Sequence, residues 1–181
     1  MKEIFFRNKE VPSLNLCKIL KRHGYPQDEG GWYWLEIIDS TPYEKVELIY
    51  KSWADLQIEK KETEEWQKLL KEKGIYRPLI SEDDFIITKA PTINEMERWL
   101  PEKLDLDAKR YRLIIWKNAD GYWCGYIPYD CKFKDFEAVQ VTGKDWRIKQ
   151  WGETLPNACA QMVIWLLGNK YIKIDRRRKH D

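Results

Sequence analysis

Hydrophobic positions are most concentrated near the end of the chain, in residues 155–167, which read Leu-Pro-Asn-Ala-Cys-Ala-Gln-Met-Val-Ile-Trp-Leu-Leu. Only Asn157 and Gln161 are polar there, and no side chain is charged. A helix that is apolar on nearly every side belongs in a protein interior. The stretch is also shorter than the roughly 20 apolar residues that a membrane-spanning helix needs. We therefore predict that it forms the central core helix of a soluble domain.

The residues that flank this stretch predict where the helix begins and ends. Thr154 can serve as the N-cap, and Pro156 falls in the first turn, where its missing N–H costs nothing. Gly168 and Asn169 follow the last apolar residue and predict a left-handed stop.

Shorter apolar stripes predict three further helices. The first has Ser13 as its expected N-cap and ends at Gly24. Its inner stripe consists of Leu16, Ile19 and Leu20. The second is predicted over residues 63–73. The third begins at Thr92, whose hydroxyl can form a capping box with the carboxylate of Glu95.

Segments rich in aromatic and β-branched residues, bounded by turn residues, predict the strands. The predicted strands are residues 32–38, 45–50, 85–88, 110–117, 122–127 and 136–141. The clearest hairpin joins two of them through the turn Asn118-Ala119-Asp120-Gly121.

The order helix, strand, strand therefore occurs twice, at residues 13–50 and 93–127. An ancient duplication and reuse of the same helix-start chemistry would both explain this repeat. The predicted class is α+β, with antiparallel hairpins packed against helices and possibly two related halves around the buried C-terminal helix. We expect a single domain over residues 1–181, with 1–89 and 90–181 as its candidate halves.

The composition limits the partners and the compartment that we expect. A net charge of +2 predicts no general attraction to nucleic acid or membrane, and the 10 Trp and 10 Tyr residues exclude a disordered chain. Residues 1–7 contain Glu3 and no long apolar run, so we expect no secretory signal. We therefore predict a cytoplasmic protein with no membrane association and with free cysteines. These cysteines are Cys17, Cys124, Cys131 and Cys159.

Residues that could carry catalysis or bind a metal do not form a recognisable set. The two histidines, His23 and His180, lie far apart in the sequence, and no closely spaced Cys or His pairs predict a zinc site. A magnesium site could draw on Asp130, Asp135 and Glu137, but we interpret these as solvated loop carboxylates. No glycine-rich phosphate loop is present. We expect no catalytic residue, no metal and no cofactor.

Aromatic residues on the predicted strands are the main candidates for contacts with a partner. Alternation along a strand sends side chains to both faces of a sheet. One aromatic face can pack on the core helix, and the other must be covered by another part of the protein or exposed to solvent. Trp and Tyr are enriched at interface hot spots, which predicts a protein partner or self-association. Mutual covering by the two halves would also explain them. The candidate contacts are Trp32, Trp34, Trp116, Tyr122, Trp123 and Tyr126.

The basic C-terminal tail suggests a second kind of partner. A compact cationic cluster of this kind can contact a phosphate backbone, and the strand aromatics could then stack on bases. The alternative function is therefore nucleic-acid binding. A frayed, solvated terminus is the preferred explanation of the tail. The cluster consists of Arg176, Arg177, Arg178 and Lys179.

Several segments together give the chain a resemblance to known sequences. These segments are residues 11–18, 31–34, 90–93 and 155–171. In this pattern the chain resembles small uncharacterised proteins encoded by phages and prophages of gut bacteria. The resemblance implies an accessory protein of a mobile element that binds a host protein, including defence components such as CRISPR effectors, and it carries over no catalytic residue.

Overall fold

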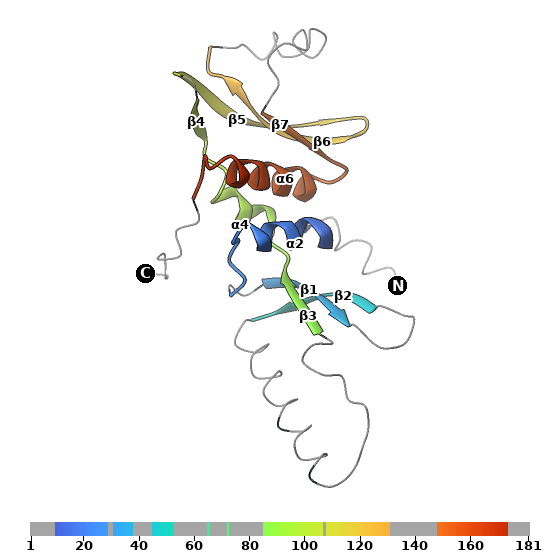
Figure 1. Cartoon of the computed structure of the whole chain (residues 1–181). Coiled ribbons are helices and arrows are strands. Elements are labelled where there is room, and N and C mark those ends of the chain that lie inside the picture. Colours follow the sequence, from blue (N-terminus) through green and yellow to red (C-terminus); the bar gives the residue numbers. More distant parts are fainter. Residues whose placement is uncertain are drawn as a thin grey trace.

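In a computed structural model of the protein, two antiparallel sheets enclose three helices within the described part of the chain (Figure 1). From one end to the other, the layers are a sheet, one helix, a pair of helices and a second sheet (Figure 1). The fold is α+β, as the sequence predicts. The described residues are 10–28, 31–37, 45–52, 65, 72, 85–106, 108–130 and 148–173. The predicted helix over 63–73 and strand over 136–141 lie outside them, apart from the single residues Glu65 and Glu72.

The predicted core helix is confirmed as α6 (Leu155–Gly168). The Thr154 hydroxyl accepts the backbone N–H of Asn157, as expected of an N-cap. The end of the helix differs in detail from the prediction, because the left-handed residue is Lys170, with φ of 62°. Asn169 keeps a φ of −89° and instead donates its side-chain amide to the carbonyl of Trp165, at 2.8 Å.

The larger sheet, which we call sheet B, packs on one side of α6. Its four strands form the order β4-β5-β6-β7 with antiparallel neighbours throughout. They are β4 (Lys103–Leu106), β5 (Lys109–Asn118), β6 (Gly121–Pro128) and β7 (Lys149–Gly152). The predicted hairpin is confirmed as β5–β6, and the Asn118 side chain accepts the N–H groups of Asp120 and Gly121 in its turn. Strands β4 and β7 are additions that the sequence pattern did not predict.

The smaller sheet, sheet A, lies at the other end of the molecule (Figure 1). Its strands are β1 (Gly31–Ile37), β2 (Lys45–Lys51) and β3 (Phe85–Lys89), in the order β2-β1-β3. Helix α2 (Leu14–Arg22) covers one face of this sheet, and the Lys18 ammonium lies 2.5 Å from the Glu36 carboxylate of β1. Gly24, with φ of 88°, follows the helix as predicted. Ser13 precedes α2 but makes no side-chain cap; its N–H donates to the Asn157 side chain, which links α2 to α6.

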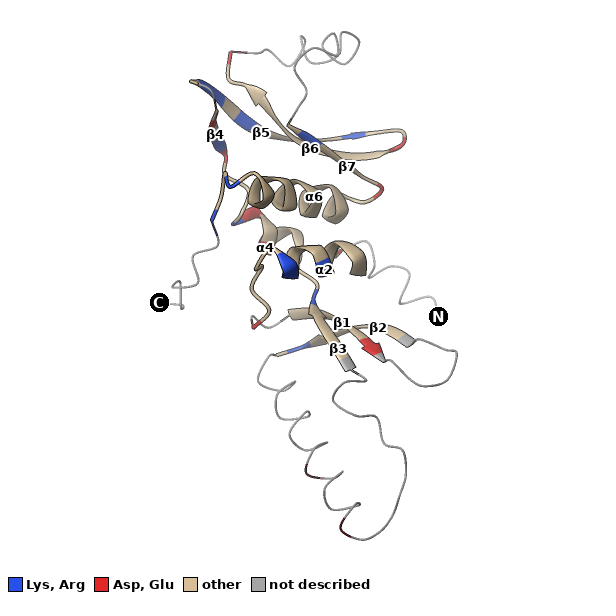
Figure 2. Ribbon diagram, in the orientation of Figure 1, with Lys and Arg blue, Asp and Glu red and all other residues tan. Residues whose placement is uncertain are grey.

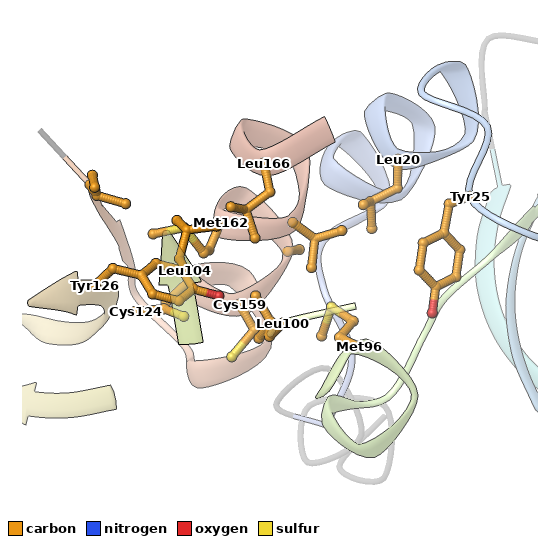
Figure 3. Packing of buried hydrophobic residues seen from close by; sticks show 14 residues of the cluster. Leu20, Tyr25, Met96, Leu100, Leu104, Cys124, Tyr126, Cys159, Met162 and Leu166 are labelled. Atoms are coloured by element: carbon orange, nitrogen blue, oxygen red, sulfur yellow. The ribbon is translucent and has the colours of Figure 1, made fainter. Parts of the chain in front are cut away.

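The short helix α4 (Ile93–Glu97) begins with the predicted capping box between Thr92 and Glu95. It packs with α2 on the side of α6 that faces away from sheet B. Figure 3 shows how the core fills the space between these elements: Cys124 and Tyr126 of β6 approach α6 from one side, and Leu20 and Tyr25 lie on the other. The apolar α6 therefore holds the two ends of the molecule together.

The division between the sheets falls near the boundary predicted for the halves, because β3 ends at Lys89 and α4 follows it. The order helix, strand, strand occurs in both parts, but β4 intervenes between α4 and the second hairpin. Across the described residues, no helix is both long enough and apolar enough to cross a membrane.

Candidate binding surface

Three tryptophans on adjacent strands of sheet B stand in register with one another. Trp123 of β6 is the Cα partner of Trp116 on β5 and of Trp151 on β7. Cys124, the next residue along β6, is buried toward α6, and successive side chains of a strand point to opposite faces. The three tryptophans therefore lie on the face of sheet B that is opposite α6. We call this set the tryptophan rung.

Two members of the tryptophan rung stack on each other. The ring centroids of Trp116 and Trp123 are 5.7 Å apart and the rings are 9° from parallel. The Lys149 ammonium lies over the Trp123 ring, 4.8 Å from its centroid, in cation–π geometry. The indole N–H of Trp123 is buried and has no hydrogen-bond acceptor in the described part of the structure. Because the protein itself buries this N–H, an acceptor on a partner cannot reach it without a movement of the atoms that cover it.

Trp151 is the most open member of the tryptophan rung, with 36% of its surface exposed. Its indole lies against Gly121, where an added Cβ would be 2.9 Å from the indole nitrogen of Trp151. Gly121 also has a φ of 154°, a conformation that other residues rarely adopt. The glycine therefore opens the space in which this ring rests on the sheet.

Basic side chains share the face of the tryptophan rung. By strand alternation this face carries Lys103, Arg110, Arg112 and Lys149. Among the described strand positions on the face, Asp105 is the one acidic residue, and its carboxylate lies 3.0 Å from Arg110. Figure 2 shows the contrast with α6, which carries no charge, whereas Lys and Arg gather along β5 and on β4 beside it. The outer face of sheet B is therefore both aromatic and cationic.

The six aromatic residues proposed from the sequence do not form one surface. They divide among three sheet faces because strand alternation separates neighbours and each sheet has its own covering helix. Trp116 and Trp123 lie in the tryptophan rung, whereas Tyr122 and Tyr126 point toward α6. Trp32 and Trp34 belong to sheet A and pack toward α2.

Burial removes two of those six residues from the candidate contacts. Trp34 is 8% exposed and donates its indole N–H to the carbonyl of Pro12 at 3.0 Å. Tyr126 is 3% exposed and its hydroxyl donates to the carbonyl of Pro101 at 2.9 Å. Burial raises the pKa of the Tyr126 phenol, and the nearby Cys124 raises it further. Both aromatic residues are thus held inside the fold by their polar atoms.

Trp151 is the candidate contact residue that sequence reasoning missed. It stands in the short segment Lys-Gln-Trp-Gly, which has one large apolar residue and no clear strand pattern. One signal could have found it. Lys149, Trp151 and Glu153 are alternate residues just before the helix cap, so in a strand their side chains would share one face. The pairing with β6 supplies the strand that the segment alone does not predict.

The other chemical candidates from the sequence are only partly described. His23 is exposed at the end of α2, and Asp130 is exposed after β6. His180, Asp135, Glu137 and the basic cluster at 176–179 lie outside the described residues. Within those described, no three His, Cys, Asp or Glu side chains gather closely enough to hold a metal ion.

Two cysteine thiols meet inside the core, where β6 packs on α6. The contact between the two thiols, together with burial, raises the pKa of Cys124, and the same contact lowers the pKa of Cys159. Both side chains are fully buried in the apolar cluster (Figure 3). No substrate can reach them there, so we assign the pair to core packing.

A buried ion pair fastens sheet A to α4. The side chain of Lys89 is 0% exposed, and its ammonium lies 2.7 Å from the Glu95 carboxylate and 5.1 Å from the centre of the Tyr33 ring. Gly31 makes room for it, because an added Cβ would be 2.8 Å from the Lys89 ammonium. A buried lysine can act as a base when it is deprotonated, but this one is paired with a carboxylate. We therefore interpret it as a structural link.

Comparison with models of protein families, with curated proteins and with solved structures finds no match to this chain.

Proposed function

We propose that this protein acts by binding a macromolecular partner, and that the partner contacts the tryptophan rung on the outer face of sheet B. The observation that carries the proposal is the alignment of three tryptophans on one face opposite the core helix. Aromatic residues that serve only the fold pack toward α6 or α2, as Tyr126 and Trp34 do.

The chemistry of the tryptophan rung supports an interaction surface. Tryptophan supplies a large contact area at low conformational cost, which is why it is enriched where binding energy concentrates. Trp151 offers an exposed ring that a partner can contact.

The expected partner classes are those that the sequence suggests. A host protein follows from the resemblance to proteins of mobile elements, and self-association would bury the same rings against a second copy. A nucleic acid would use the rings for stacking and the basic residues for its phosphates.

Capture from a bacterial lysate tests the surface independently of the partner class. Tagged wild-type protein and the variants Trp151→Ser and Tyr50→Ser would be compared for the proteins and nucleic acids that they retain. Tyr50 is the matched control because it is 68% exposed but lies on sheet A. We expect Trp151→Ser to lose the major retained species and Tyr50→Ser to keep it. Equal retention by all three proteins, each with wild-type circular dichroism, would contradict the proposal.

A further inference from the structure

We propose that strand β2 pairs with β2 of a second copy of this chain, so that two copies of sheet A join edge to edge about a two-fold axis at Leu48. This inference goes beyond the proposed function, because it concerns the edge of sheet A and not the tryptophan rung. It draws on three observations: side chains cap only one edge of sheet A among the described residues, the other edge carries exposed apolar side chains, and its sequence can pair with itself.

Side chains cap the outer edge of β3, which is one of the two edges of sheet A (Figure 1). The ammonium of Lys21, on α2, donates to the carbonyl of Ile87 at 3.1 Å. The side-chain oxygen of Gln27 accepts the N–H of Lys89 at 3.0 Å. An open strand edge is a template for pairing with another chain, and natural proteins cover such edges. The β3 edge is therefore closed to a further strand.

The hydrogen-bond pattern shows which backbone groups β2 presents at the opposite edge. The Trp32 carbonyl accepts the N–H of Ala90, so the backbone groups of Trp32 point toward the side of β3. Alternate residues of an antiparallel strand point these groups to opposite sides, so those of Tyr33 point toward β2 and its partner Ile49. The outward backbone groups of β2 belong to Val46, Leu48 and Tyr50. No described strand pairs with this edge.

The same three residues direct their side chains to the face of sheet A on which α2 packs. Leu48 lies beside Trp34 in the cluster under α2. Tyr50 is 68% exposed and Val46 is 42% exposed, so α2 leaves this margin of the face open. The Tyr50 ring contacts that of Trp32 edge-on, with 5.1 Å between the centroids. Strand β2 therefore offers an added strand both hydrogen bonds and apolar contacts.

The sequence of β2 can pair with itself in antiparallel orientation. When Leu48 stands opposite Leu48 of the second copy, Val46 stands opposite Tyr50 of that copy, and this pair occurs twice. Opposite residues of antiparallel strands share a face, and pairs of an aromatic with a β-branched residue stabilise a sheet. The same register joins the outward backbone groups of these three residues to those of the second copy.

The capped edge of β3 explains why the partner is one further copy and not a growing chain of copies. A two-fold axis uses the same surface of both copies and closes the assembly at a dimer. The remaining edge of each sheet is the one that Lys21 and Gln27 cover. In this register Lys45 stands opposite Lys51 of the second copy, but Glu47 is the diagonal neighbour of that lysine and offsets the like charges.

Sedimentation equilibrium of the full chain between about 1 and 200 μM tests the inference by measuring the Kd of the dimer. The variants are Tyr50→Lys, Val46→Glu and the double variant that combines them. Tyr129→Lys is the matched control, because Tyr129 is 51% exposed but follows β6 of sheet B. Circular dichroism compares the fold of each variant with that of the wild type, and these exposed positions should leave it unchanged.

We expect the wild type to dimerise and each single variant of β2 to raise the Kd at least about tenfold, because each loses both pairs of Val46 with Tyr50. The double variant should return to within about threefold of the wild-type Kd, because an acidic side chain then stands opposite a basic one at both ends. Tyr129→Lys should change the Kd by less than about twofold, because it lies outside the proposed interface.

Three results would overturn the inference. A wild type that stays monomeric over this range has no interface between β2 strands, and a protein lost from lysate capture by Tyr50→Lys would then supply the strand. A dimer with the same Kd in Tyr50→Lys forms through another surface. A double variant that stays as weak as the single variants excludes the register about Leu48. The proposed function stands or falls separately, because lysate capture tests Trp151.

Discussion

Trp34 and Trp123 both lie on a central strand of an antiparallel sheet, but the two sheets use them differently. In sheet A, helix α2 covers Trp34, and the carbonyl of Pro12 accepts its indole N–H. In sheet B, Trp123 lies opposite the covering helix α6, stacks on Trp116 and has a buried N–H without an acceptor among the described residues. The indole N–H is therefore paired within the fold in sheet A, and it has no acceptor among the described residues in sheet B.

The two sheets also hold their charges differently. Sheet A buries the Lys89 side chain against Glu95, whereas the outer face of sheet B carries the exposed Lys103. Burying a charge is costly unless it is paired, and a solvated charge costs little. The comparison predicts that substitutions of buried residues in sheet A act on stability and that substitutions on the outer face of sheet B act on binding.

The largest effect is expected at Trp34. We expect Trp34→Ala to lower the free energy of unfolding by about 3–5 kcal/mol, because it removes a buried ring and its hydrogen bond to the carbonyl of Pro12. Denaturation with urea, followed by circular dichroism, measures the change. Trp34→Phe keeps most of the ring and should lose less. A loss below about 1 kcal/mol for the alanine variant would show that Trp34 is not a core residue.

A similar contrast is expected between two lysines. Lys89→Met should lower the free energy of unfolding by about 3 kcal/mol, because the Glu95 carboxylate loses its buried partner. Lys103→Met should change it by less than about 0.5 kcal/mol, because that side chain is exposed. The double variant Lys89→Met with Glu95→Gln should be less destabilised than the sum of its single changes. Equal changes in the free energy of unfolding for the two lysine substitutions would contradict the proposed difference between the sheets.

Alkaline pH should weaken the core of sheet A. Burial raises the pKa of Cys17 from 9.0 to about 12, against the lowering effect of the nearby Trp34 indole. A raised pKa stabilises the fold fully below pH 9.0, and this contribution is lost as the pH rises toward about 12. The loss is at most about 1.4 kcal/mol per pH unit for one proton. Between pH 8 and 11 the free energy of unfolding should therefore fall less steeply for Cys17→Ala than for the wild type. An equal slope for the two proteins would contradict the contribution assigned to Cys17.

Of the two tryptophan substitutions, the smaller effect on stability is expected at Trp151. We expect Trp151→Ser to change the free energy of unfolding by less than about 1 kcal/mol, because the ring is partly exposed and lies at the edge strand β7. The same urea titration measures it. A loss comparable with that of Trp34→Ala would mean that the tryptophan rung serves the fold as the rings of sheet A do.

Much of the local structure follows from short-range signals in the sequence. The core helix α6, the capping box at Thr92 and the hairpin β5–β6 were all predicted, because a cap, an apolar run or a turn marks each one. Strands β4 and β7 have only four residues and few apolar side chains. Their pairing with β5 and β6 depends on tertiary contacts that no local pattern contains.

The candidate surface was harder to predict than the fold. Alternation shows that Trp32 and Trp34 share a face, but it does not show that α2 covers this face. For the same reason Tyr126 and Trp123 could not be separated into core and surface before the position of α6 was known. Trp151 joined the tryptophan rung only through the pairing of β7 with β6. The local sequence predicts whether a segment forms a helix or a strand, whereas tertiary packing determines which face of a sheet is covered.

Photochemical cross-linking tests most directly whether the outer face of sheet B is the contact surface. The wild-type protein would be irradiated with a uridine 20-mer that contains 4-thiouridine, and the cross-linked peptides would be identified by mass spectrometry. We expect cross-links in the peptides that contain Trp116, Trp123 and Trp151, with loss of the last in Trp151→Ser. Cross-links confined to the basic cluster at 176–179, or to peptides of sheet A, would contradict the central claim.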